Sequence, residues 1–225
     1  MGRAEEQVSE AFDLKTYLRA REVTMAIVNE LALSLAPGTD EEEAHELCKS
    51  IFARHGVAKL WHPSKIRFGK NTLCTFKEVS EPDVRLGMGE LFYVDLGPVV
   101  DGHEGDYGET YRCGGGSDPL ISASREIFNL TEKAWREQGL TGEGLYKVAT
   151  AAAKERGFKL DLRSDGHRCG DFPHAVFHKG GLGEFNTQPV PGLWILEIHL
   201  VDEARERAAF FEDVLGLQEL EAQTV

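Results

Sequence analysis

Five side chains of the kinds that bind metal ions constrain this chain of 225 residues most, because they lie in separate segments that one fold must bring together. Four carry carboxylates and one carries an imidazole, and such a set can hold two divalent cations side by side. A pair of cations can lower the pKa of a shared water and hold both ends of a displacement at a carbonyl or phosphoryl centre. The five residues are Asp95, Asp106, His167, Glu197 and Glu212.

The first two carboxylates are placed by a predicted β-hairpin. Residues 91–94 are an apolar, strand-forming run, and Asp101-Gly102 is a strong signal for a two-residue turn. With the turn there, Asp95 lies opposite Gly108, and Asp106 is its diagonal neighbour on the same face. Two carboxylates aimed at one point repel, and one takes up a proton unless a cation is present. The alternative is an acidic, exposed hairpin, which is common in a chain with 38 Asp and Glu against 25 Lys and Arg.

The other three residues come from the second half of the chain. Residues 193–196 predict a strand that ends on Glu197, and Phe210-Phe211 leads into Glu212. Taken singly, a glutamate at a strand end is usually solvated, and a lone histidine usually bonds to the backbone. The full set favours a metal site instead.

The five segments together resemble a known group of enzymes. They are YVDLG at 93–97, GDYGET at 105–110, GHRCG at 166–170, LEIHL at 196–200 and FFEDV at 210–214. In this order they resemble the superfamily of methionine aminopeptidase, aminopeptidase P and prolidase, whose shared domain is called the pita-bread fold. The resemblance extends from about residue 10 to Leu217.

A weak internal repeat agrees with the fold that this resemblance implies. Helices are expected at roughly 10–35, from Thr39 (in a capping box with Glu42) to His55-Gly56, at 119–138 and at 141–156, and strands follow each pair. The implied class is α+β, a pseudo-symmetric pair of helix-helix-antiparallel sheet halves around a dinuclear metal site. We expect one domain over residues 1–225, without the separate N-terminal domain of the aminopeptidase P and prolidase relatives.

The resemblance also assigns a role to each ligand. Asp95 would chelate the first metal ion, Asp106 and Glu212 would bridge the pair, and His167 and Glu197 would complete the second. A metal-bridged hydroxide would attack a small peptide or amide carbonyl, with Glu197 as a proton acceptor. The oxygen-rich set suits two ions of Mn or Fe, and Co or Zn would also bind.

Three further histidines are candidates for contact with the substrate. His174 matches a second family histidine, which does not bind metal and contacts the substrate carbonyl, so it would donate to the developing oxyanion. His178 lies four residues further on, and a structural role is an equal alternative. His199 shares the strand face of Glu197, where the family's usual proline after this glutamate is replaced by Ile198.

One departure from the family concerns the leaving group. The family's peptidases carry another histidine before the first aspartate strand, and it contacts the nitrogen of the scissile bond. Counted from Gly69, this position falls on Phe76, while His62 comes too early unless the loop is rearranged. The metal ligands are therefore kept where the leaving-group contact is lost, which argues against ordinary aminopeptidase action.

Composition narrows the partners and the location. A net charge of −13 argues against nucleic acid or an anionic membrane as a partner, and no apolar run reaches the length of a membrane helix. The N-terminus lacks the hydrophobic region of a signal peptide, and the cysteines form no CxxC pair, so we expect free thiols in a reducing cytoplasm. A small molecule or short peptide is the expected substrate, and a homodimer remains open. The cysteines are Cys48, Cys74, Cys113 and Cys169.

Three functions remain open from the sequence. The first is a dinuclear metallohydrolase of the aminopeptidase type, acting next to a free amine or an imino acid, and the retained ligands and His174 favour it. The second is a metalloenzyme on the same scaffold that acts on a non-peptide, amino-acid-like metabolite, which Phe76 and the Ile198-His199 variation favour. The third is a non-catalytic binding module, although such relatives typically lose metal ligands.

Overall fold

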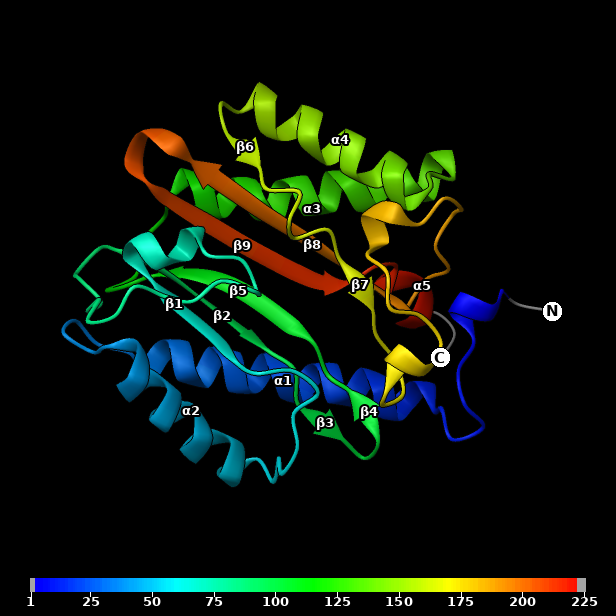
Figure 1. The fold of residues 1–225 in the computed structure, drawn as a ribbon, viewed down its shortest axis with the longest axis horizontal. Coiled ribbons are helices and arrows are strands. Elements are labelled where there is room, and N and C mark those ends of the chain that lie inside the picture. The colour runs from blue at the N-terminus through cyan, green and yellow to red at the C-terminus, as the bar shows by residue number, and fades with distance from the viewer. Residues whose placement is uncertain (1–2, 222–225) are drawn as a thin grey trace.

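The structure, a computed structural model, describes residues 3–221 and is built from helix pairs packed on an antiparallel sheet (Figure 1). The first pair is α1 (Leu14–Ser34) and α2 (Glu41–Arg54), and the second is α3 (Pro119–Gln138) and α4 (Gly142–Glu155). A short helix, α5 (Leu217–Glu221), follows the last strand. None of the helices within residues 3–221 is long and apolar enough to cross a membrane.

Within residues 3–221 the main sheet has seven strands, and its central part joins the two halves of the chain. In spatial order the strands are β1 (Lys65–Phe68), β2 (Leu91–Leu96), β5 (Tyr107–Arg112), β9 (Arg207–Val214), β8 (Trp194–Asp202) and β6 (Lys159–Leu160), with β7 (His167–Arg168) also paired to β8. The pairing of β5 with β9 is where the N-terminal strands meet the C-terminal ones.

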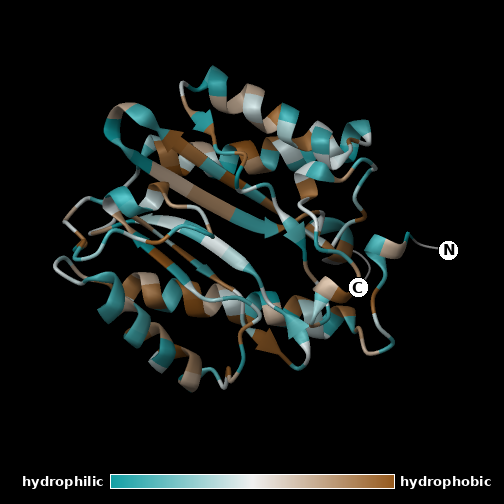
Figure 2. Cartoon of the chain, in the orientation of Figure 1, coloured by the Kyte–Doolittle hydropathy of each residue, from teal (hydrophilic) through white to brown (hydrophobic). Residues whose placement is uncertain are grey.

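Both helix pairs cover the same face of the sheet. Asn29 of α1 accepts a hydrogen bond from Tyr111 of β5, and Phe128 of α3 packs edge-on against Phe211 of β9. The register places Tyr111 and Phe211 on one face, because Phe211 lies opposite Glu109, two residues before Tyr111. The opposite face is thereby left open for the site. In Figure 2 hydrophobic residues lie along the strands and on the helices beside them.

The predicted hairpin is confirmed. Asp101 and Gly102 form the turn with φ of 47° and 79°, between the short strands β3 (Val99–Val100) and β4 (His103–Glu104), which pair with each other. Positive φ at both central residues is the conformation that matches the twist of a tight hairpin. The same register continues into β2 and β5, where Asp95 lies opposite Gly108.

The α+β class is confirmed, while three predicted boundaries were wrong. Helix α1 begins at Leu14 and not near residue 10, because the Asp13 carboxylate caps it by accepting from Thr16 N. The capping box of α2 is one residue later than predicted, formed by Asp40 and Glu43. Strand β8 does not end on Glu197 but runs to Asp202, since its pairing with β9 continues as far as Asp202 opposite Arg207.

None of the cysteines in the described part of the chain is paired in a disulfide. Cys48, Cys113 and Cys169 are buried, and Cys169 donates from Sγ to the Glu104 carbonyl oxygen. The single domain over residues 1–225 and the cytoplasmic location stay predictions.

Candidate metal centre

A row of residues crosses four strands on the open face of the sheet. Asp95 of β2 lies opposite Gly108 of β5, Gly108 lies opposite Glu212 of β9, and Glu212 lies opposite Glu197 of β8. Neighbouring strands are about 5 Å apart, so these side chains are within reach of one another. A Cβ on Gly108 would come within 2.5 Å of the Glu212 Oε1 atom. The glycine therefore leaves the space that the Glu212 carboxylate occupies.

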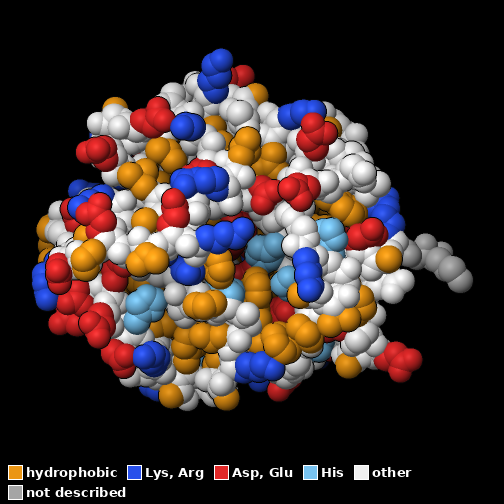
Figure 3. Space-filling model, in the orientation of Figure 1, with side chains coloured by type: hydrophobic (Ala, Val, Ile, Leu, Met, Phe, Trp, Pro, Cys, Tyr) orange, Lys and Arg blue, Asp and Glu red, His pale blue; other side chains and the backbone are white. Residues whose placement is uncertain are grey.

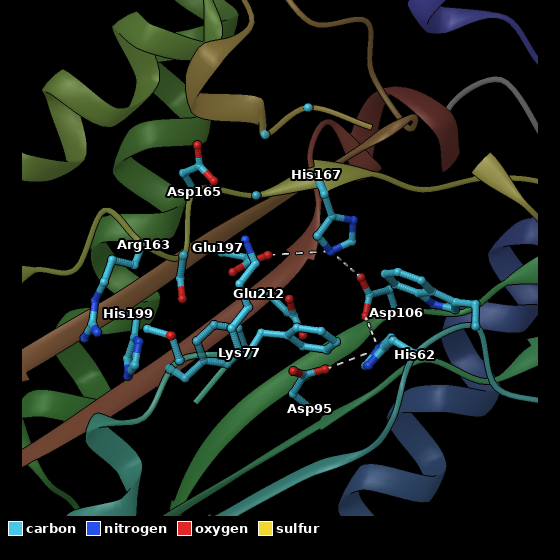
Figure 4. A pocket seen from close by; sticks show the side chains of 18 of the residues that line it. His62, Lys77, Asp95, Asp106, Arg163, Asp165, His167, Glu197, His199 and Glu212 are labelled. Carbon is cyan, nitrogen blue, oxygen red and sulfur yellow. Dashed lines mark ion pairs between the residues drawn. The ribbon is translucent and has the colours of Figure 1, made fainter. Parts of the chain in front are cut away.

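Asp106 and His167 approach this row from its side (Figure 4). Asp106 precedes β5 and is 1% exposed, and its Oδ2 lies 3.1 Å from His167 Nε2. The same Nε2 lies 3.5 Å from Glu197 Oε1. His167 Nδ1 donates to the Arg168 carbonyl oxygen at 2.7 Å, which leaves Nε2 as the nitrogen that faces the carboxylates. The structure thus brings all five predicted ligands to one cavity.

His62, which the sequence left undecided, also lies at this cavity. Its Nε2 atom is 3.5 Å from Asp95 Oδ1 and 3.6 Å from Asp106 Oδ1, and its side chain is 5% exposed. The loop before β1 lies alongside the hairpin, because Trp61 N donates to the Gly97 carbonyl oxygen at 2.9 Å. The only sign of this contact in the sequence is the glycine at position 97. A Cβ on Gly97 would overlap the His62 ring, so the close approach of the loop requires glycine there.

The charges in the cavity are poorly compensated by the protein alone. Burial and the neighbouring carboxylates raise the pKa of Glu212 well above its usual range, and burial raises the pKa of Glu197 to about 7. Burial would also raise the pKa of Asp106, but His167 and His62 together lower it. Burial alone would lower the pKa of His167, and contact with Asp106 raises it to about 10. Ionising all four carboxylates therefore requires more positive charge than two imidazoles supply.

Poorly paired oxygens point to the same conclusion. Within residues 3–221, both carboxylate oxygens of Asp106 and Oε1 of Glu212 are buried without a hydrogen bond, although His167 Nε2 and His62 Nε2 lie 3.1 and 3.6 Å from the Asp106 oxygens. Buried carboxylate oxygens in this condition are costly unless they are protonated or bind a cation. These oxygens and the adjacent imidazole nitrogens are the donors that divalent transition metals prefer, so the residues fit a metal centre.

The cavity around these residues has a volume of about 280 Å³. Its walls are aromatic, from Trp61, Phe76, Tyr93 and Phe210, and basic side chains line its outer part, namely Lys77, Arg163 and Lys179. Figure 3 shows the hollow on this face, with histidine side chains inside it and Lys and Arg side chains around it. A cavity of this size suits a small substrate.

His174 lines the cavity and is oriented by a residue that the sequence analysis missed. Its Nδ1 lies 2.7 Å from Glu104 Oε2, and its backbone N donates to Glu104 Oε1 at 3.0 Å. Glu104 is 1% exposed and comes from the hairpin that carries Asp106. The His174 ring is stacked 5.9 Å from the His167 ring. A glutamate two residues before Asp106 was the available signal, but nothing local links it to His174.

The remaining predicted contacts have different outcomes. Phe76 lines the cavity, with its ring 5.6 Å from the His62 ring. His199 also lines it, is 1% exposed, and bonds through Nε2 to the Thr72 carbonyl oxygen at 2.8 Å. His178 is not brought to the cavity. Its ring packs 5.4 Å from Trp194 and 6.2 Å from Phe185, although the next residue, Lys179, lines the cavity.

Comparison with known proteins agrees with this geometry. The model of metallopeptidase family M24 matches residues 15–203, and the chain belongs to this family. Methionine aminopeptidase A of Synechocystis sp. is 22% identical over 214 residues, covering 89% of this chain and 83% of that protein. The predicted superfamily is confirmed, as is the class of a metallohydrolase related to aminopeptidases.

Solved structures share the fold, which confirms the predicted pita-bread class. The prolidase of Pyrococcus horikoshii superposes with a TM-score of 0.71 at 21% identity, covering 92% of this chain but only 59% of that one. The methionine aminopeptidase of Thermotoga maritima superposes with a TM-score of 0.69 at 15% identity, covering 96% of this chain and 99% of that one. The chain therefore spans about three fifths of the prolidase and nearly the whole of this methionine aminopeptidase.

Proposed function

We propose that this protein is a dinuclear metal-dependent hydrolase of the aminopeptidase type, which cleaves a small peptide or amide next to a free amine or an imino acid. The observation that carries the proposal is the convergence of carboxylates from both halves. The row from Asp95 to Glu197 ends in one cavity with Asp106 and His167. Relatives named methionine aminopeptidase and prolidase share its family or fold.

Two overlapping ligand sets would hold the metal ions. Asp95 with Asp106 and Glu212 would hold the first, and His167 with Glu197 and the same two bridging residues would hold the second. When bound, such ions supply a Lewis acid and lower the pKa of a water. The carboxylate-rich set favours Mn or Fe, and Co or Zn would also bind.

The chain's own residues would move protons and stabilise charge. Glu197 faces the cavity with Oε1 3.5 Å from His167 Nε2, and it would act as the proton acceptor there. His174 would donate from Nε2 to the substrate carbonyl oxygen. The buried Glu104 carboxylate, 2.7 Å from Nδ1, would hold the ring in place for this contact.

A second candidate is an enzyme on the same scaffold that acts on a non-peptide, amino-acid-like metabolite. Phe76 supports it, since an apolar ring stands on the cavity wall at the position counted for the leaving-group histidine. The small volume of about 280 Å³ fits a metabolite as well as a dipeptide.

Metal analysis and a substrate panel test both candidates. Chelator-treated protein would be reloaded with Mn, Fe, Co or Zn, analysed for metal, and assayed on dipeptides with methionine or proline and on amides of free amino acids. Two ions per chain with release of an N-terminal residue supports the first candidate. Two ions with turnover of non-peptide substrates alone supports the second, and protein that binds no metal contradicts both.

A further inference from the structure

Two imidazoles approach Asp106 from opposite sides of the site (Figure 4). His167 Nε2 lies 3.1 Å from Oδ2, and His62 Nε2 lies 3.6 Å from Oδ1. Each ring then contacts a second carboxylate of its own half, Glu197 for His167 and Asp95 for His62. The surroundings of His62 thus mirror those of a residue already proposed as a ligand.

The tautomer of both rings is arranged in the same way. His62 Nδ1 lies 3.0 Å from the Pro63 carbonyl oxygen, and His167 Nδ1 lies 2.7 Å from the Arg168 carbonyl oxygen. Histidines that bind metal commonly donate their other ring N–H to such an acceptor, which fixes the ring and leaves a lone pair on the ligating nitrogen. In both residues that nitrogen is Nε2, and in both it faces the carboxylates.

The loop that carries His62 is fastened to the hairpin that carries the two aspartates. Trp61 donates from its backbone N to Gly97 O at 2.9 Å and from Nε1 to Gly105 O at 3.1 Å. The Trp61 and His62 rings pack edge to face with centroids 4.3 Å apart. His62 is therefore held beside the carboxylates by contacts that do not depend on its own charge.

We propose that His62 is a ligand of the first metal ion, together with Asp95, Asp106 and Glu212, which rests on the dinuclear site proposed above. Metal–ligand bonds of roughly 2.0–2.2 Å place neighbouring ligand atoms roughly 3.0–3.5 Å apart. The Nε2 atom of His62 already lies 3.5 and 3.6 Å from the oxygens of Asp95 and Asp106. Only a small closure onto a shared ion is needed.

This assignment changes the chemistry of the first site. Each ion would have one imidazole and three carboxylates, in place of a first site made of carboxylates alone. Imidazole suits Fe and Zn, while purely carboxylate sites suit Mn and Mg. His62 would therefore make the two sites similar in affinity and shift the preference of the first toward Fe, Co or Zn.

Nuclear magnetic resonance of ¹⁵N-histidine-labelled full-length protein, titrated with Zn(II), tests the assignment directly. Zn(II) is diamagnetic, and coordination changes the ¹⁵N chemical shift of the ligating nitrogen. The His62 and His167 signals would be assigned by His62→Gln and His167→Gln. We expect the Nε2 signals of both residues to move to metal-bound positions, and those of His174 and His199 to keep their tautomeric pattern.

Zn(II) affinity, measured by competition with a chromophoric chelator, gives a second readout. His62→Gln and His62→Phe, which keeps a ring against Trp61, should each weaken one of the two sites by at least ~10–100-fold, the usual cost of losing even an outer hydrogen-bond partner of a metal ligand, and leave the other within about threefold. His55→Gln is the matched control, since His55 pairs with Glu30 on the surface. The metal-free melting temperature checks that each variant is folded.

The outcomes separate this proposal from the one on which it rests. Movement of the His167 signal alone, with wild-type affinity at both sites in the His62 variants, would overturn the assignment and keep the dinuclear site. If neither histidine signal moves in the unmodified protein, both proposals fail. A loss of turnover in the His62 variants without any change in zinc binding would place His62 against the substrate and also overturn the assignment.

Discussion

The two halves of the molecule share one plan and contribute different chemistry to the cavity. Each packs a helix pair on a central two-stranded unit, β2 with β5 in the N-terminal half and β8 with β9 in the C-terminal half. In the first unit a carboxylate faces a glycine, Asp95 opposite Gly108, whereas in the second two carboxylates face each other, Glu197 opposite Glu212. In this row the N-terminal half therefore contributes one carboxylate and the C-terminal half contributes two.

The difference shows how the halves depend on each other. Gly108 has no side chain, so the long Glu212 carboxylate crosses from the C-terminal half into the space beside Asp95 and Asp106. The strands that join the halves, β5 and β9, pair at Gly108 with Glu212 and at Glu109 with Phe211. Metal binding at this row would therefore also stabilise the contact between the halves.

The largest expected effect comes from Asp106, which contacts an imidazole on each side. Metal at about 100 times its dissociation constant should raise the melting temperature of the unmodified protein by roughly 5–10 °C. Asp106→Asn should lose nearly all of this gain and all measurable turnover, because both proposed ligand sets include this residue. Differential scanning fluorimetry with and without metal measures the gain.

Glu132→Gln is the matched control for Asp106→Asn, since Glu132 is a buried carboxylate on α3 that accepts from Gly216 N. It should keep the gain produced by metal. The two halves do not share a metal centre if metal raises the melting temperature of Asp106→Asn as much as that of the unmodified protein. The same conclusion follows if saturating metal does not raise the melting temperature of the unmodified protein.

A smaller effect is expected at His174, a C-terminal residue held by Glu104 of the N-terminal hairpin. His174→Ala should keep the metal content near normal and lower turnover by about 10²–10³, the usual cost of one oxyanion donor. Glu104→Gln should keep the ring in place and lower turnover less. Steady-state kinetics beside metal analysis separates the two quantities. His178→Ala, outside the cavity, should leave turnover unchanged, and equal losses in both alanine variants would contradict the role of His174.

The stability of the metal-free protein should depend on pH because of Glu197, which lies opposite Glu212. The pKa of Glu197 is raised by burial to about 7 in the folded state, above its ordinary value of 4.5. Its ionisation therefore costs stability as pH rises from about 4.5 to 7, and the full cost persists above pH 7. Glu197→Gln should raise the free energy of unfolding by ~1–3 kcal/mol at pH 8 and have no effect below about pH 4.5.

Urea denaturation at the two pH values measures this difference. Glu203→Gln, on the exposed turn between β8 and β9, serves as the control and should change stability little at either pH. If the metal-free Glu197→Gln variant is less stable than the unmodified protein at pH 8, then the ionised Glu197 carboxylate does not destabilise the folded protein.

The smallest effect is expected at Phe76, which lies beside His62 on the N-terminal wall of the cavity. Phe76→His should raise hydrolysis of dipeptides several-fold if a polar contact to the leaving nitrogen is what the chain lacks. Phe76→Ala is the control: it widens the cavity without adding a polar group, so a gain in dipeptide hydrolysis that comes from the polar contact should be absent in this variant. Unmodified protein that cleaves dipeptides well, with no gain from Phe76→His, would remove the support for a non-peptide substrate.

The sequence alone determined the parts of this protein that depend on neighbouring residues. The Asp101-Gly102 turn sets the hairpin register, and the period of two along a strand then places Asp95 opposite Gly108 with Asp106 on the same face. The order of the five motifs indicated the family. The predicted start of α2 was off by one residue because two adjacent side chains, Thr39 and Asp40, can both cap a helix, and in the structure Asp40 does so.

Only the tertiary structure decided which distant segments meet. The pairing of Gly108 with Glu212 joins residues about a hundred positions apart, and it depends on two helix pairs packing on one face of the sheet. Contacts between distant segments also bring His62 to the aspartates, hold His174 on Glu104, and place the His178 ring against Trp194. No turn or strand period links these residues along the chain, because their distances are set by side-chain packing and loop contacts across the whole fold.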